Sequence, residues 1–133
     1  MINSKILKIA SNTKCFGLKN TYTHKSNIKN SKCGDRIKVE VVVKEKKIKS
    51  LRYETEACIL CEASASLLAR KIKLFSTKDY KKDIKELNES IRKNVEYLPI
   101  KFLVFKDLIN KSNISRFDCI MLPFNALLKA LKL

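Results

Sequence analysis

The spacing of apolar residues changes part-way along the chain. Between 37 and 43, apolar residues at every second position alternate mostly with charged ones, which predicts a half-buried strand. A turn at 45–47 then leads into a return strand over 48–55. Later segments place their apolar residues at helical spacing instead. The predicted helices cover 2–10, 58–72, 78–94, 100–110 and a last segment that ends at Leu131.

The polar stretch 11–34 is predicted to be mostly loop, with a short strand around Thr21–His24. Pro99 breaks the chain after the charged helix, and Pro123 is expected in the first turn of the last helix. Strands that come early and helices that follow indicate an α+β fold. With 133 residues, the chain fits one domain over 1–133.

The net charge of +16 raises the question of a nucleic-acid or acidic-membrane partner. Only five of the cations are arginine, whereas bidentate recognition of phosphates and guanines favours arginine. We therefore interpret most of the charge as lysine spread over solvated faces and do not expect nucleic acid as the partner. A basic nucleic-acid-binding module with a structural metal stays as an alternative, and an acidic protein would be steered in quickly.

The N-terminus mixes charges into a short apolar pattern and lacks the features of a secretory signal. No segment offers the roughly 18 apolar residues needed to span a bilayer, so we expect a cytoplasmic protein without a membrane partner. Thiols are kept reduced there, and the cysteine count is odd. These facts favour metal binding or thiol chemistry over disulfides for the five cysteines, at 15, 33, 58, 61 and 119.

Three of these cysteines precede or begin predicted elements where a metal could be held. Cys33 and Asp35 flank Gly34 on one turn, and the hairpin returns the chain to Cys58 at the start of a helix. Cys119 again precedes a predicted helix. Three thiolates and one carboxylate would make a tetrahedral site suited to Zn²⁺.

Spacing alone leaves a second interpretation open, because isolated free cysteines are often small buried core residues. The pair Cys58 and Cys61 also has the CxxC spacing of redox and zinc motifs, but the chain has no second CxxC. His24 is the only histidine, and nothing near it indicates catalysis.

Several motifs, taken in order, resemble the NifU N-terminal domain family, which includes IscU and SufU. The similarity extends over essentially the whole chain. It is carried by Asn12-Thr13-Lys14-Cys15-Phe16-Gly17, Cys33-Gly34-Asp35, Ala57-Cys58-Ile59, Ala63-Ser64-Ala65-Ser66 and Arg116-x-x-Cys119-x-x-Leu122-Pro123. Asp118 stands where the IscU branch has a histidine, and the long stretch between Cys58 and Cys119 is similar to the SufU branch.

The resemblance implies a small three-stranded antiparallel sheet packed with about five helices. It implies that Cys33, Asp35, Cys58 and Cys119 bind zinc, and that Cys33 and Cys119 carry the sulfur chemistry. A SufU-like protein accepts sulfur, as a sulfurtransferase, from a PLP-dependent cysteine desulfurase of the SufS or IscS type. An IscU-like scaffold would instead assemble a [2Fe–2S] cluster on the equivalent ligands. Other Suf or Isc assembly proteins and apo iron–sulfur proteins are the further partners implied.

The chain departs from the family pattern at several positions, none of which removes a ligand. Thr13 and Ser31 replace prolines, Phe124 replaces a tryptophan, and Ala57 replaces a glycine. Cys61 stands where the family has a small residue, one helical turn from Cys58. It would be either an alternative or resolving thiol or a packed core residue.

Overall fold

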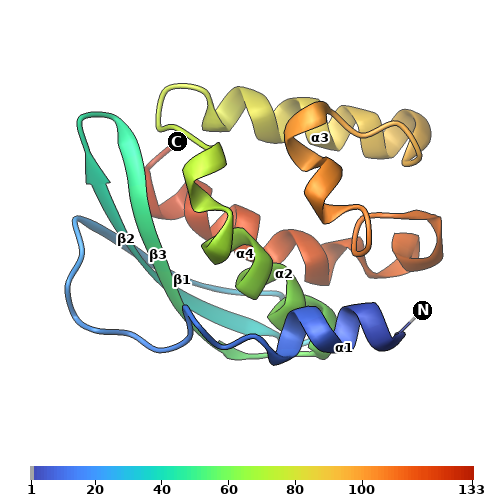
Figure 1. Cartoon of the computed structure of the whole chain (residues 1–133), viewed down its shortest axis with the longest axis horizontal. Coiled ribbons are helices and arrows are strands. Elements are labelled where there is room, and N and C mark those ends of the chain that lie inside the picture. The colour runs from blue at the N-terminus through green and yellow to red at the C-terminus, as the bar shows by residue number, and fades with distance from the viewer. Residues whose placement is uncertain (1) are drawn as a thin grey trace.

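The computed structural model describes residues 2–133 and contains a sheet with helices packed against it (Figure 1). The three strands lie in the order β1-β2-β3, and both pairs are antiparallel. The α+β fold class and the three-stranded sheet predicted from the sequence are confirmed. The elements are α1 (Ser4–Ser11), β1 (His24–Lys29), β2 (Arg36–Lys44), β3 (Lys47–Glu56), α2 (Ile59–Arg70), η1 (Ile72–Leu74), α3 (Tyr80–Asn94), η2 (Ile100–Phe105), η3 (Lys111–Arg116) and α4 (Phe117–Ala130).

The sheet has one face in the core and a second face covered in part by a loop. Ile37, Val39 and Val41 point into the core and are at most 1% exposed, as their alternation in sequence predicts. Glu40 faces the other way and is also buried, because the chain before β1 crosses it. Its carboxylate accepts hydrogen bonds from the amides of Lys19 (2.8 Å) and Asn20 (3.0 Å), which anchors that loop to the sheet.

Helix α2 runs through the middle of the molecule and packs against α1, α4 and β3 (Figure 1). It is apolar or small on nearly every side, which is the pattern of a helix buried all round. Its alanines and serines let the neighbouring helices approach closely. The buried Ser64 hydroxyl donates to the Ile120 carbonyl at 2.6 Å and so joins α2 directly to α4.

The structure corrects several sequence predictions. The first strand is β1, later than the predicted Thr21–His24, because its register is set by pairing with β2. The segment predicted as a helix over 100–110 is the shorter 3₁₀ helix η2 followed by turns. Pro123 lies inside α4 and not in its first turn, since η3 and the start of α4 occupy the predicted connection. None of the helices described over residues 2–133 is long and apolar enough to cross a membrane.

The hydroxyl bridge between α2 and α4 gives a first prediction. Replacing Ser64 with alanine leaves a small void and removes a buried donor, so the free energy of unfolding should fall by about 1–2 kcal/mol. Urea denaturation followed by circular dichroism measures the change. The exposed Ser112→Ala is the control and should change stability by no more than about 0.5 kcal/mol. Equal stability of the two variants would contradict a structural role for the bridge.

Candidate metal centre

The loop between β1 and β2 presents the first two candidate ligands. The Asn30 amide donates to the Asp35 carbonyl (2.7 Å), and the Gly34 amide donates to the Asn30 carbonyl (2.8 Å), which closes the loop. Gly34 has a φ of +76°, a conformation that side chains with a Cβ rarely adopt. This turn leaves Cys33 exposed, while Asp35 enters the molecule at the start of β2.

Asp35 is only 7% exposed and is oriented by the backbone of α2. The Cys58 amide donates to Asp35 Oδ1 at 3.1 Å. Asp35 Oδ2 is buried and accepts no hydrogen bond from any residue in 2–133. Burial of a carboxylate oxygen without a hydrogen-bond partner is energetically unfavourable, and a cation bound to this atom would offset that cost.

Cys58 is brought to this point by the hairpin of β2 and β3. Arg36 at the start of β2 pairs with Glu56 at the end of β3, so the residues that follow β3 lie beside the loop that holds Asp35. Cys58 is then the N-cap of α2 and is half-buried.

Cys119 comes from the first turn of α4, which packs against α2. It is 4% exposed, and its Sγ lies 3.7 Å from Cys33 Sγ. Burial raises the pKa of the Cys119 thiol to about 12, although the Arg116 guanidinium, 3.9 Å away, acts to lower it. The Cys119 thiol is therefore uncharged at neutral pH unless a cation joins it.

The three ligand atoms of Cys33, Asp35 and Cys119 all lie within 4.8 Å of one another. Two sulfurs bound to one tetrahedral zinc at about 2.3 Å would be about 3.8 Å apart, close to the separation of Cys33 and Cys119. The unpartnered Oδ2 of Asp35 adds a hard oxygen donor. Two thiols and a carboxylate at this spacing fit a zinc ion or another thiolate-binding metal.

The fourth predicted ligand lies next to this group but is not part of it. The Cys58 thiol influences the pKa of both Asp35 and Cys119, so it lies within reach of each. It is not among the ligand atoms that are mutually within 4.8 Å. The structure thus brings three of the four predicted ligands together and holds Cys58 beside them.

The thiols also affect the pKa of the Asp35 carboxyl group. Burial acts to raise the pKa of Asp35, but the side chains of Cys58, Cys119 and Cys33 together outweigh it. The result is a pKa below the ordinary value of an aspartate. Asp35 is therefore ionised at neutral pH and ready to bind a cation.

The other cysteines and the histidine lie apart from this site or behind it. Cys61 is fully buried on α2, which supports the interpretation as a packed residue, and burial strongly raises the pKa of its thiol. Cys15 lies half-buried in the loop after α1. The ring of His24 contacts the hydroxyl of Thr23 (2.8 Å) on β1, away from the candidate ligands.

One contact at the rim was not predicted from sequence. Lys32 and Asp118, the neighbours of Cys33 and Cys119, form an exposed ion pair at 3.3 Å. An exposed pair contributes little stability, but this one links the β1–β2 loop to α4. Its only signal in the sequence is that opposite charges flank two candidate ligands.

A family model for the NifU-like N terminal domain matches residues 1–132. The chain belongs to the NifU-like N-terminal domain family. The resemblance found in the sequence motifs is thereby confirmed. Members of the NifU-like family are scaffolds of iron–sulfur cluster assembly. A comparison with curated protein sequences finds no match.

Solved structures share this fold. The N-terminal part of a NifU-like protein from Brucella abortus superposes with a TM-score of 0.83, at 19% identity over 98% of this chain and 91% of the other. A putative iron–sulfur cluster assembly scaffold protein for the SUF system from Fervidobacterium islandicum AW-1 gives a TM-score of 0.79, at 19% identity over 98% and 96%. At this identity the likeness shows the common fold.

The difference in burial between Cys33 and Cys61 gives a second prediction. In metal-free protein at neutral pH, iodoacetamide should modify Cys33 rapidly and Cys61 only after unfolding, because the Cys61 thiol is buried and its pKa is raised. Tryptic mass spectrometry with fragmentation measures each site. Protein unfolded in guanidinium is the control, in which all five cysteines should react. Equal rates for Cys33 and Cys61 in the native protein would contradict the buried position.

Proposed function

We propose that this protein is a zinc-dependent sulfur acceptor of the SufU type, which takes sulfur from a PLP-dependent cysteine desulfurase for iron–sulfur cluster assembly. The observation that carries the proposal is the pair of thiols of Cys33 and Cys119, 3.7 Å apart, beside the unpartnered Oδ2 of Asp35. Of the two thiols, Cys33 is exposed and Cys119 is buried. A large partner can therefore reach the site through Cys33.

Zinc would be held by Cys33, Asp35, Cys58 and Cys119. The ion would keep these thiols deprotonated at neutral pH, which a buried thiol such as Cys119 does not achieve alone. The Cys58 amide holds Asp35 through Oδ1 and leaves Oδ2 available as the oxygen donor. The chain itself thus orients the carboxylate before any metal arrives.

The sulfur-accepting thiol is Cys33, with Cys119 as the second thiol. The Cys33 thiolate attacks the outer sulfur of the persulfide on the desulfurase cysteine. A new S–S bond forms on Cys33, the S–S bond of the partner breaks, and the partner cysteine leaves as a thiolate. Arg116, whose guanidinium lies 3.9 Å from Cys119 Sγ, adds positive charge beside the transferred, negatively charged sulfur.

A second candidate function is that of an IscU-like scaffold. The family to which the chain belongs supports it, and the same three cysteines and Asp35 would then hold a [2Fe–2S] cluster as cargo. The cluster would be passed to apo-proteins, and no zinc would remain in the resting protein. The two candidates differ in the metal that the purified protein contains.

Metal content gives the third prediction. Protein purified without oxygen should contain one zinc per chain and no visible absorbance, because the donor atoms are spaced for a single tetrahedral ion. Elemental analysis for zinc and iron, with a sulfide assay, measures this. Asp35→Ala should lose most of the zinc, whereas Asp118→Ala, at the exposed rim, should keep it. Stoichiometric iron and sulfide in place of zinc would support the scaffold instead.

Sulfur acceptance gives the fourth prediction. Addition of the protein to a cognate cysteine desulfurase should stimulate the turnover of cysteine, and Cys33→Ser, Cys58→Ser and Cys119→Ser should each abolish the stimulation. Serine retains the shape of the side chain but lacks the nucleophilic and metal-binding sulfur. Cys15→Ser is the matched control and should retain most of the stimulation. Full activity in all three ligand variants would show that the thiols are not the acceptors.

A further inference from the structure

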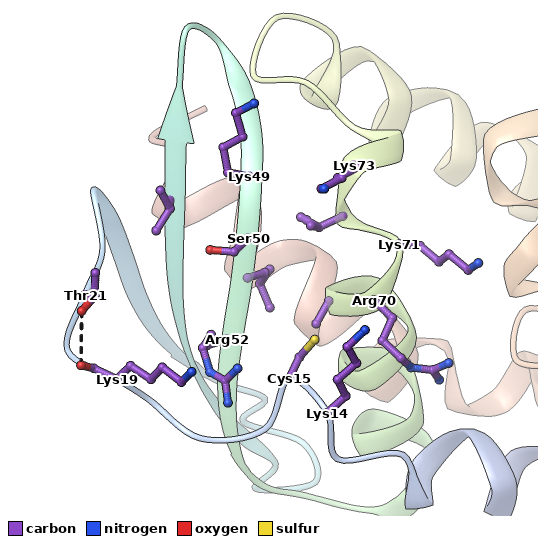
Figure 2. A pocket seen from close by; sticks show the side chains of 14 residues that line it. Lys14, Cys15, Lys19, Thr21, Lys49, Ser50, Arg52, Arg70, Lys71 and Lys73 are labelled. Carbon is purple, nitrogen blue, oxygen red and sulfur yellow. Dashed lines mark hydrogen bonds between the residues drawn. The ribbon is translucent and has the colours of Figure 1, made fainter.

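A basic groove lies along β3, at the opposite end of α2 from the thiols (Figure 2). Its volume is about 650 Å³, within the range of ligand-binding clefts. The floor contains Val42, Leu51 and Ile72, and the rim is built from the loop after α1, β3 and the end of α2. We call it the β3 groove.

The charge of the β3 groove is of one sign. Seven of its fourteen lining residues are lysine or arginine, and none is acidic. None of these cations forms an ion pair within residues 2–133, where the ion pairs involve Lys5, Lys32 and Lys101 instead. Cations gathered within a Debye length of about 8 Å repel one another unless an anion joins them.

Three lysines from separate segments face this groove. Figure 2 shows Lys73 pointing from η1 towards β3, Lys49 on β3, and Lys14 rising from the N-terminal loop between β3 and α2. Arg70 and Lys71 turn away from β3 in the same view. Arg52 is held by the carbonyls of the loop at residues 16 and 17, at 2.6 and 2.8 Å, and so fixes one wall of the groove.

The groove continues into a second hollow of about 510 Å³ that shares Lys49 and Lys73 with it. Lys47 adds a further exposed cation there, and Leu74 is 44% exposed. Asp79 also lines the second hollow, so the two hollows together make an elongated surface that is mainly basic, with Leu74 as an exposed apolar residue. An elongated surface of this kind fits a chain of several negative charges better than a single phosphate.

The residues that line the groove also indicate which class of ligand it would bind. Proteins that bind single-stranded nucleic acid combine a basic groove with aromatic side chains on which bases stack. The first hollow has no aromatic residue, and Phe75 in the second is only 3% exposed. The mixture of lysines with the exposed Leu74 and the half-buried Val42 instead matches acidic and apolar side chains of a peptide.

The outer edge of β3 adds a peptide-binding feature. β3 is an edge strand of the sheet, and in residues 2–133 the bridges on its outer edge join Tyr53 to Phe16 and Lys47 to Ser76. The stretch 48–52 between these bridges lines the groove. An exposed strand edge offers backbone donors and acceptors to an extended peptide.

We propose that the β3 groove docks an extended acidic segment of a protein partner. The lysines bind its carboxylates, and the exposed Leu74 contacts an apolar side chain of the segment. The groove lies at the C-terminal end of α2, and this 12-residue helix, about 18 Å long, separates it from Cys58 at the N-cap. The inference therefore does not depend on the proposed sulfur chemistry and fails or succeeds separately.

The fifth prediction tests this docking with a fluorescein-labelled peptide of about ten residues, Glu and Asp with a central Leu, roughly 33 Å long when extended. Fluorescence anisotropy should show saturable binding by the full-length protein. The variant Lys14→Glu/Lys49→Glu/Lys73→Glu should bind the peptide at least about tenfold more weakly than the wild type, because like charges then face the peptide. All three lysines are exposed, so the fold should persist.

The matched control is Lys81→Glu/Lys82→Glu/Lys85→Glu, which reverses three exposed lysines on α3 and changes the net charge by the same amount. It should bind the peptide as the wild type does, apart from a small general effect of charge. Equal weakening in both variants would overturn the proposal, since binding would then follow net charge alone. A single-stranded oligonucleotide that binds this groove more tightly than the peptide at physiological salt would also overturn it.

Cys15 provides an independent readout because its thiol lines the same groove. Trypsin places Cys15 on the peptide 15–19, separate from every other cysteine. Saturating acidic peptide should slow alkylation of Cys15 several-fold, and a Gln/Asn peptide of equal length should not. An unchanged rate at Cys15 under saturation would place the peptide elsewhere and refute docking in this groove.

Discussion

The hydrogen bond from the Cys58 amide to Asp35 Oδ1 is the contact on which the candidate centre depends. It joins the loop between β1 and β2 to the first turn of α2, and it can form because β2 and β3 pair from Arg36 to Glu56. With one oxygen occupied by a backbone donor, Asp35 is fixed in orientation and its other oxygen is left for a cation. A single amide thus orients a buried carboxylate whose other oxygen is a candidate metal ligand.

The position of Cys119 depends on a different set of forces. It belongs to α4, which the chain reaches only after α3 and two 3₁₀ helices, so no local sequence pattern sets its distance from Cys33. That distance follows from packing α4 against α2, where small residues allow a close approach and Ser64 bonds the Ile120 carbonyl. The distance between Cys33 and Cys119 is therefore fixed only as precisely as the packing of α4 against α2.

Local patterns explain what could be predicted from the sequence. The strands β2 and β3 and the helix α3 follow their periodicity closely, α2 follows from its run of small and apolar residues, and the candidate ligands were predicted from ordered motifs. β1 was misplaced because its residues alternate weakly and its register comes from β2. Burial of Glu40 depends on a loop that folds over it, and the place of Cys58 beside the other three ligands depends on long-range packing. No local pattern in the sequence indicates the burial of Glu40 or the position of Cys58.

The two ends of α2 differ in the charge that they favour. Its N-terminus donates a hydrogen bond to the ionised Asp35 carboxylate, whereas the lysines near its C-terminal end and η1 favour an acidic partner. Exposed lysines act over a distance that salt shortens, whereas the buried Asp35 and Cys119 are screened much less. A partner held at the β3 groove would therefore respond to ionic strength, and the chemistry of the thiols would not. The helix would thus separate the proposed docking site from the proposed chemistry, and both sites are built on this one element.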